Sequence, residues 1–566
     1  MSRRSARREE ARRKLNIAKV IVATILVSLT FLLVFFLFIN KDEETTEKEP
    51  VVENKVEDEV VEETVQNRTV EEVVESFGGS IIEKIKDDTC YASVDGKECT
   101  IYASGESYDG RIKLWDGTAA EPKINEDGTI DINTAQELKW VADKVINGEK
   151  NFSGVTINLR QHIDLGARKT ENGWEGPDWT PIVGFLDELP KDDKNKNLVV
   201  DDSIVVDESM DVKQENLKRF AGHFNGNEFT IRGMKVDSSK DYQGLFGYQV
   251  GTIENLTISY SYVKGNDTVG ALVALNGGII KRCSSLNNEV VGNNKVGALI
   301  GVAASNSNLN SIHTADNVTG NKYVGGVIGY VNNNVKIYSA SSRGTTLGKE
   351  YVGGILGISF YGNEISHIQT THGKVEGEEY VGGLVGYSQA QIEKSYILDK
   401  VTVKGNKYVG GLVGANHSVG SILNSSSAAK VIVLEDNAGG IAGINYGSIL
   451  NVFNIGNIDS TGASGIRVGG ICGENASESS ITSAYSVGII LYKDSAEGIV
   501  GIDFGTTSKA YYLDSSLDNK AADKALERTE ESMKNEILND LGEAFVKDEY
   551  NVNNGYPILS WQKDIV

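Results

Sequence analysis

Glycines and apolar residues recur at a nearly constant spacing through the second half of the chain. The recurring motif has the form Y-V-G-G, followed by two apolar residues and a Gly. The residue before the apolar pair falls at Gly244, Ala271, Ala298, Gly326, Gly354, Gly383, Gly411, Gly440, Gly470 and Gly498. These intervals of 27 to 30 residues predict a solenoid in which each motif contributes one coil.

A second strand-like run follows each motif after a short polar turn, as in IENLTIS at 253–259 and ILNVFNI at 449–455. A third, weaker run then leads to a Gly turn. Three short strands per repeat, without a helix-forming stretch, are typical of a parallel β-helix. We therefore predict a mainly β fold in which residues 236–515 form one continuous β-helix, with coils hydrogen-bonded at a spacing of ~4.8 Å.

Different patterns flank the repeats. From Asn133 or Thr134, either of which can act as the N-cap, the segment to Asn147 carries apolar residues at the helical spacing i, i+3, i+4, i+7. This spacing predicts an amphipathic helix that covers an open sheet edge. We assign residues 131–235 to an N-terminal cap with the first coils, and residues 516–566 to a C-terminal cap.

Equivalent positions of the repeats form columns when the coils stack. One column predicts a corner turn with positive φ, because Gly adopts that conformation at low cost; it contains Gly265, Gly292, Gly320, Gly348, Gly377 and Gly405. Three residues later, a second column contains Tyr323, Tyr351, Tyr380 and Tyr408. These tyrosines are either a stabilising aromatic ladder or a platform that contacts a sugar or a peptide.

The column just before the tyrosines contains an acidic pair, Glu350 and Glu379. On neighbouring parallel strands, two carboxylates lie at a spacing that suits a retaining glycosidase. Lys322 and Lys407 flank the pair in the same column, so a surface charge ladder is the simpler interpretation. These two glutamates are the catalytic candidates that the sequence offers.

The beginning of the chain carries a membrane signal. Seven Lys and Arg residues lie within the first 14 positions, and Val20–Ile39 then runs without a charged residue. As a helix this run is ~30 Å long, which matches the hydrocarbon core of a bilayer. We predict a cytoplasmic tail at 1–16 and a single transmembrane helix at 17–40. The helix is expected to remain as an anchor instead of being cleaved as a signal peptide, so that the rest of the chain is extracellular.

Charge and cysteine content refine this picture. Residues 41–85 are strongly acidic, which predicts an extended stalk, and the net charge of −23 argues against a nucleic-acid partner. Residues 86–130 are expected to form a small segment with a local disulfide between Cys90 and Cys99. Cys283 and Cys472 occupy apolar positions of the repeat and are expected to be buried thiols.

The sequence lacks the motifs of common catalytic sites. It contains no H-E-x-x-H zinc motif, no G-x-S-x-G nucleophile elbow and no phosphate-binding loop with its Lys. We therefore expect no metal, no other cofactor and no enzymatic activity.

The motif YVGGLVG, with the polar turn and I-x-N-S that follow it, resembles the GLUG repeat. This repeat occurs in bacterial surface proteins and in the non-catalytic part of immunoglobulin A peptidases. The ending NNGYPILSWQ at 553–562 resembles the usual close of such regions. The resemblance covers about residues 130–566 and implies a right-handed β-helix displayed at the cell surface.

Three functions fit these observations. The first is a membrane-anchored, non-enzymatic surface protein that binds an unknown glycan or protein ligand, or acts as a spacer. The second is a carbohydrate-active β-helix enzyme that uses the acidic pair. The third is a structural component of a cell-envelope assembly.

Overall fold

The computed structural model describes residues 69–76, 80–86, 89–94, 97–102, 115–183, 219–462, 467–493, 495–517 and 526–565. The predicted cytoplasmic tail at 1–16, the predicted transmembrane helix at 17–40 and most of the predicted stalk at 41–85 lie outside these residues. Within the described ranges, no helix is both long enough and apolar enough to span a membrane.

The first described segment is a small antiparallel sheet with one helix. Helix α2 (Val70–Ser76) precedes β1 (Ser80–Lys86), β2 (Thr89–Val94) and β3 (Lys97–Tyr102), and the strands pair in that order. The helix packs against the sheet, and its first residue, a valine, is buried there. The folded segment therefore begins before the predicted boundary at residue 86, because the valines of this part of the chain have a sheet to cover.

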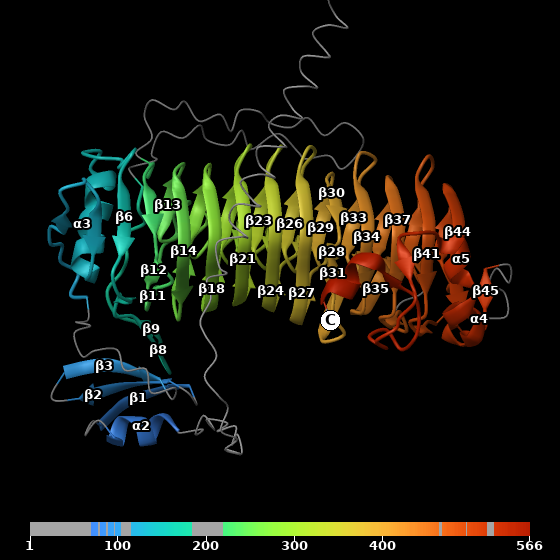
Figure 1. Cartoon of the computed structure of the whole chain (residues 1–566), viewed down its shortest axis with the longest axis horizontal. Helices are drawn as coiled ribbons and strands as arrows, with labels where there is room; N and C mark the ends of the chain where they lie inside the picture. Colours follow the sequence, from blue (N-terminus) through green and yellow to red (C-terminus); the bar gives the residue numbers. More distant parts are fainter. Residues whose placement is uncertain are drawn as a thin grey trace, which may run out of the picture. The chain divides into compact units, whose positions relative to one another are not determined.

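The remainder is a parallel β-solenoid built from two sheets (Figure 1). One coil shows the path of the chain. The long strand β21 (Asn308–Thr319) is followed by the corner strand β22 (Lys322–Gly325) and the short strand β23 (Ile328–Val331), after which β24 (Lys336–Leu347) begins the next coil. This coil therefore contains three strands, the number that the repeat predicts.

The coils stack to form a short sheet of ten strands and a main sheet of thirty. The other strands of the short sheet are β13 (Phe246–Gln249), β17 (Val273–Asn276), β20 (Ile300–Ala303), β26 (Leu356–Ser359), β29 (Val385–Ser388), β33 (Val413–Asn416), β36 (Ala442–Asn445), β40 (Cys472–Asn475) and β43 (Val500–Asp503). The other long strands of the main sheet are β14 (Thr252–Ser259), β18 (Ile279–Val291), β27 (Glu364–Glu376), β34 (Ser421–Ser427), β37 (Ser448–Asn454), β41 (Ser480–Ser486) and β44 (Thr506–Leu513).

Further strands complete the main sheet. Those at or before the corners are β12 (Lys235–Asp237), β15 (Tyr262–Lys264), β16 (Asp267–Val269), β19 (Asn294–Gly297), β25 (Glu350–Gly353), β28 (Glu379–Gly382), β32 (Val401–Gly410), β35 (Lys430–Gly439), β38 (Ile458–Asp459), β39 (Val468–Gly469) and β42 (Ile490–Leu491). The others are β4 (Lys123–Ile124), β5 (Ile130–Ile132), β6 (Thr156–Leu159), β7 (Ile163–Asp164), β10 (His223–Asn225), β11 (Thr230–Arg232), β30 (Gln391–Glu393), β31 (Tyr396–Ile397) and β45 (Glu527–Arg528).

The strand register confirms one coil per motif. Every strand of the short sheet begins two residues after one of the ten aligned motif positions, as β23 does after Gly326. No helix interrupts the described residues between β10 and β44. The prediction of a continuous parallel solenoid is therefore confirmed, whereas its right-handedness stays a prediction.

The glycine column at the corner has a different role from the predicted one. None of its members has a positive φ; the left-handed residues of the corner are instead the tyrosines, with φ between 53° and 58°. A Cβ on Gly348 would lie 2.7 Å from Cγ2 of Val352 and 2.9 Å from Cγ2 of Val324. The prediction of positive φ is thus wrong, because these glycines make room for the valine side chains that fill the corner.

Helix α3 (Ala135–Ile146) begins at its N-cap Thr134, which forms a capping box with Glu137. Its apolar face is buried in the core of the first coils, and Figure 1 shows the helix at their N-terminal end. The predicted residues of this face are all buried, namely Leu138, Val141, Ala142 and Val145. The expected capping helix is confirmed.

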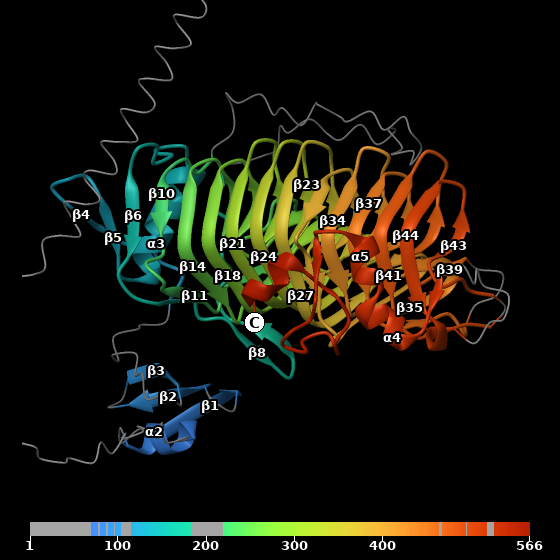
Figure 2. The same cartoon turned by 45° about the vertical axis from the view of Figure 1, so that its right-hand side comes forward.

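The C-terminal segment covers a side of the solenoid and does not only cap its end. Its apolar residues pack on outward-facing side chains of the main sheet, including Phe453 and Tyr485. Figure 2 shows this segment, in red, alongside the strands of the last coils. The indole N–H of Trp561 donates a hydrogen bond of 2.8 Å to the carbonyl oxygen of Asn424, several coils back from the end. Besides β45, the elements are α4 (Glu530–Asn535), α5 (Ile537–Leu541), β46 (Phe545–Val546), β47 (Ile558–Leu559) and the 3₁₀ helix η3 (Ser560–Ile565). The predicted end cap at 516–566 is corrected accordingly, because the last coils carry apolar side chains on their outer face.

The cysteines fall into two groups. Cys283 pairs in register with Ile312, and Cys472 with Val500, so both occupy the predicted apolar columns. Both are buried and without a disulfide within the described part of the chain, and burial raises the pKa of the Cys283 thiol to about 12. Strands β2 and β3 pair Cys90 with Ile101 and Cys99 with Ala92, so the two cysteines lie diagonally across one hairpin, and their disulfide stays a prediction.

Candidate binding surface

The four column tyrosines lie on successive corner strands, and their rings stack along the solenoid. The centroids of Tyr323 and Tyr351 are 5.2 Å apart, those of Tyr351 and Tyr380 4.9 Å, and those of Tyr380 and Tyr408 4.8 Å. The planes of successive rings differ by 21°, 6° and 10°. Each tyrosine has a left-handed backbone conformation within its corner strand, and the rings join a cluster of their own outside the main core.

This second cluster lies on the face of the short sheet opposite the main core. Tyr323 meets Tyr330 edge to face with ring centroids 5.5 Å apart, and Tyr351 meets Tyr387 in the same way at 6.0 Å. A Cβ on Gly357 would lie 2.6 Å from the carbonyl carbon of Tyr323, so the short sheet and the corner strands are nearly in backbone contact. The last Gly of the motif permits this close approach, which buries the tyrosine rings.

Burial differs along the column. Tyr323 and Tyr351 are only 7% and 3% exposed, whereas Tyr380 and Tyr408 are half-buried. Because neighbouring rings cover each other's faces, a ligand can reach ring edges and hydroxyls here but not a flat aromatic face. The predicted aromatic ladder is therefore present, and its accessible part is at Tyr380 and Tyr408.

The hydroxyls of these two tyrosines are available to a ligand. Neither has a hydrogen-bond partner within the described part of the chain. Burial, with nearby carboxylates such as Glu379, holds the pKa of both phenols above its ordinary value, so the hydroxyls stay protonated at neutral pH. Each can donate one hydrogen bond and accept another.

A row of charged residues borders the tyrosines. Lys322, Glu350, Glu379 and Lys407 are paired in register on successive coils, as the sequence predicts. The Lys322 ammonium lies 2.8 Å from the Glu350 carboxylate and 5.3 Å from the centroid of the Tyr351 ring. Glu350 and Glu379 are thus neighbours, but they belong to a surface ladder in which a lysine flanks the acidic pair on each side, and not to an enclosed pocket. The described residues contain no group of His, Cys, Asp and Glu arranged to hold a metal ion.

Sequence reasoning missed the aromatic residues that complete this surface. Tyr330 and Tyr387 occupy one column of the short sheet, and Tyr446, 40% exposed, lies near enough to Tyr380 to affect its phenol. The signal in the sequence is the apolar or aromatic residue that follows the final Gly of the motif, as in VGGVIGY and VGGLVGY. Ile328 packs in the main core and Tyr330 in the second cluster, so both faces of the short sheet are buried.

No protein-family model matches the chain, so its resemblance to the GLUG repeat stays a prediction. The chain is 32% identical to Halomucin of Haloquadratum walsbyi, over 36% of its own length and 2% of that protein. It is 29% identical to a "Putative Gly-rich membrane protein" of Evansella cellulosilytica, over 38% of its own length and 23% of that protein. The chain therefore spans less than a quarter of these relatives. Among solved structures, a "putative immunoglobulin A1 protease" from Bacteroides ovatus is 16% identical with a TM-score of 0.29, over 78% of this chain and 95% of that one.

Proposed function

We propose that this protein is a membrane-anchored surface protein whose solenoid binds an external ligand without chemical turnover. The proposal rests mainly on the two free phenol hydroxyls of Tyr380 and Tyr408, which lie beside a row of charged side chains. Aromatic edges with polar neighbours are suited to hydrogen bonding with a glycan or a peptide. Near-identical coils favour an extended contact surface over a catalytic pocket, which needs one unlike set of residues.

The membrane anchor of this proposal is the charge-free run at Val20–Ile39 behind a basic flank. It is supported by the name of the Evansella relative, which is called a membrane protein. The GLUG-like motif YVGGLVG agrees with display at a surface.

The topology can be tested with intact cells stripped of their wall. Protease added from outside is expected to remove the solenoid and to spare a fragment that contains residues 1–16, because the basic flank holds the N-terminus inside. Antibodies against an N-terminal tag and against the solenoid distinguish the two parts. A solenoid that survives this treatment, while a control surface protein is digested, would reverse the proposed orientation.

The binding surface can be tested with conservative substitutions. The double variant Tyr380→Phe with Tyr408→Phe keeps the ring stack and removes both hydroxyls. It is expected to bind its ligand on a glycan array about thirtyfold more weakly, because two neutral hydrogen bonds of about 1 kcal/mol each contribute about 2 kcal/mol. Tyr338→Phe is the matched control, since this tyrosine is 51% exposed on the outer face of the main sheet. Equal loss in the control, or no loss in the double variant, would contradict this site.

A glycan-cleaving enzyme is the second candidate, because Glu350 and Glu379 are in register on neighbouring coils. Such an enzyme needs one protonated and one ionised carboxyl group. The double variant Glu350→Gln with Glu379→Gln removes both. Should the unmodified protein release shorter glycans and this variant fail to do so, turnover replaces binding as the function.

A further inference from the structure

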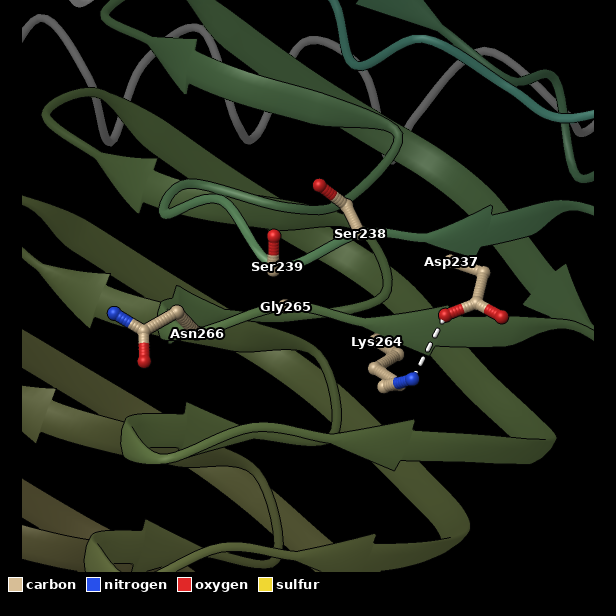
Figure 3. Close-up of a pocket in the computed structure, with 6 residues that line it drawn as sticks. All are labelled: Asp237, Ser238, Ser239, Lys264, Gly265 and Asn266. Atoms are coloured by element: carbon tan, nitrogen blue, oxygen red, sulfur yellow. Dashed lines mark hydrogen bonds and ion pairs between the residues drawn. The ribbon is translucent and has the colours of Figure 1, made fainter.

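The first coils contain a polar pocket that shares no residue with the tyrosine surface. Its volume is about 420 Å³, and it lies between two successive corners of the solenoid (Figure 3). Its lining residues are Asp237, Ser238, Ser239, Lys264, Gly265 and Asn266. Asp237 pairs in register with Lys264, so the pocket joins equivalent positions of neighbouring coils.

An extra residue in one corner accompanies this pocket. Asp237 pairs with Lys264, and Gln243 pairs with Val269. Five residues (238–242) therefore form the first corner, whereas four (265–268) form the next. The longer corner places two consecutive serines where the following coil has Gly and Asn, and this breaks the repeat locally.

The pocket offers donors and acceptors with no net charge. The Lys264 ammonium and the Asp237 carboxylate are 2.9 Å apart, and both side chains are 46% exposed. The Asn266 amide nitrogen donates to Asp241 at 2.8 Å, which leaves the amide oxygen as an acceptor. The Ser238 hydroxyl oxygen accepts the backbone N–H of Lys240 at 3.0 Å, so its proton is free to be donated.

An aromatic pair borders the ion pair. Tyr262 precedes Lys264 by two residues on β15, and its side chain therefore emerges on the same side of the strand. Burial is the main cause of its raised pKa, and the charges of Lys264 and Asp237 also act on it, which places the phenol beside them. The Tyr262 ring stacks on Trp174 with centroids 5.8 Å apart and planes at 15°.

A hairpin holds Trp174 in this position. The hairpin consists of β8 (Arg168–Thr170) and β9 (Gly173–Glu175). Its Trp174 indole N–H donates to Glu289 at 3.1 Å, and the Lys169 ammonium lies 2.8 Å from the same carboxylate. Two separate contacts with one glutamate fix the hairpin on the main sheet, so the aromatic pair is pre-positioned beside the ion pair of the pocket.

We infer that this corner pocket binds a single sugar residue of a glycan. Asp237 accepts a hydrogen bond from one ring hydroxyl, Lys264 donates to the adjacent hydroxyl, and Tyr262 borders the apolar side of the ring. A phosphate or a carboxylate ligand fits less well, because Asp237 already neutralises the one cation that lines the pocket. An apolar ligand would leave the lining groups without partners, which costs free energy.

The test uses the full chain in a detergent that has no sugar headgroup. Ligand-observed NMR is recorded with the methyl glycosides of glucose, galactose, mannose and N-acetylglucosamine. At least one of them is expected to bind with a millimolar dissociation constant, which is usual for a small exposed site. The double variant Asp237→Ala with Lys264→Ala should weaken this binding at least tenfold.

Two further variants decide whether the loss is specific. Lys336→Ala with Glu364→Ala removes a comparable exposed ion pair, 3.3 Å apart, and should leave binding unchanged. The Asp237 and Lys264 variant is also measured in a chain that already carries Tyr380→Phe and Tyr408→Phe, where the same loss is expected; this separates the pocket from the tyrosine surface of the proposed function. The inference is overturned if none of the glycosides binds, if binding survives in the Asp237 and Lys264 variant, or if inorganic phosphate displaces the sugar from the pocket.

Discussion

Replacing Gly382 with Ala is expected to disrupt the middle of the solenoid, whereas replacing Gly277 with Ala is not. A Cβ on Gly382 would lie 2.0 Å from the carbonyl oxygen of Val385 and within 2.8 Å of backbone atoms of the next coil. These atoms belong to hydrogen-bonded strands and cannot move aside singly. The nearest atom to a Cβ on Gly277 is a side-chain carbon of Val250 at 3.2 Å, which can adjust.

The two variants can be compared by urea unfolding followed by circular dichroism. Gly382→Ala is expected to lose more than about 3 kcal/mol of stability, since overpacking against backbone is among the costliest substitutions. Gly277→Ala should remain within about 1 kcal/mol of the unmodified protein. Because coils contact only their neighbours, limited proteolysis should cut the Gly382 variant near that coil first. Similar losses in the two variants would show that the tight turn does not require Gly.

The sequence itself distinguishes tight glycine positions from tolerant ones. The first Gly of the motif is Gly in every coil from Gly270 to Gly469, whereas the next position holds Ala271 and Ala298 in two coils. The period and the strand register could be predicted because stacked coils repeat the same environment at each position. The charge ladder at Glu350 and Glu379 followed from this register alone, and the structure confirms it.

Other features depend on contacts that a repeat pattern does not contain. The column of corner glycines predicts a position that accepts only a small residue. The pattern does not distinguish a backbone with positive φ from a lack of room for a Cβ atom. The stack of tyrosines was predicted, yet its burial depends on the second apolar face of the short sheet. The C-terminal segment packs beside Tyr485, whose partners near Asn553 lie far away in the sequence and have no periodic signal.

A buried ladder of amides also escaped the sequence analysis. The Asn416 amide nitrogen donates to the Asn445 amide oxygen at 2.7 Å, and Asn445 donates to Asn475 at 2.8 Å. All three end strands of the short sheet and are fully buried. Asn is common in polar turns, so its recurrence after the motif does not by itself indicate a buried ladder.

A buried carboxyl group at Asp316 leads to a prediction in which a substitution stabilises the protein. This residue is 5% exposed on β21, where it lies opposite a bulge of the neighbouring strand β18. Its Oδ1 accepts the backbone N–H of Asn288 at 2.7 Å, while Oδ2 has no hydrogen-bond partner among the described residues. Burial raises the pKa of Asp316 from 3.8 to about 7. The folded protein therefore disfavours the ionised form that water would stabilise in the unfolded chain.

The preceding coil shows what can replace this carboxyl group. Asn288 lies at the equivalent position, and its side-chain oxygen accepts the backbone N–H of Ser261 at 2.8 Å. An Asn at position 316 keeps the same acceptor and cannot ionise. Asp316→Asn is therefore expected to stabilise the protein at neutral and alkaline pH.

The pH dependence gives the sign of this effect. Because the pKa is higher in the folded state, the unmodified protein loses stability as the pH rises from about 4 to about 7, and the loss is then constant. Urea unfolding should show equal stabilities at pH 4 and an advantage of about 2–4 kcal/mol for Asp316→Asn at pH 8. Asp399→Asn, at an exposed turn, is the control and should show no such divergence. If Asp316→Asn is instead less stable at pH 8, the carboxylate is ionised and favourably paired in the folded coil, and the bulge of β18 opposite it requires its charge.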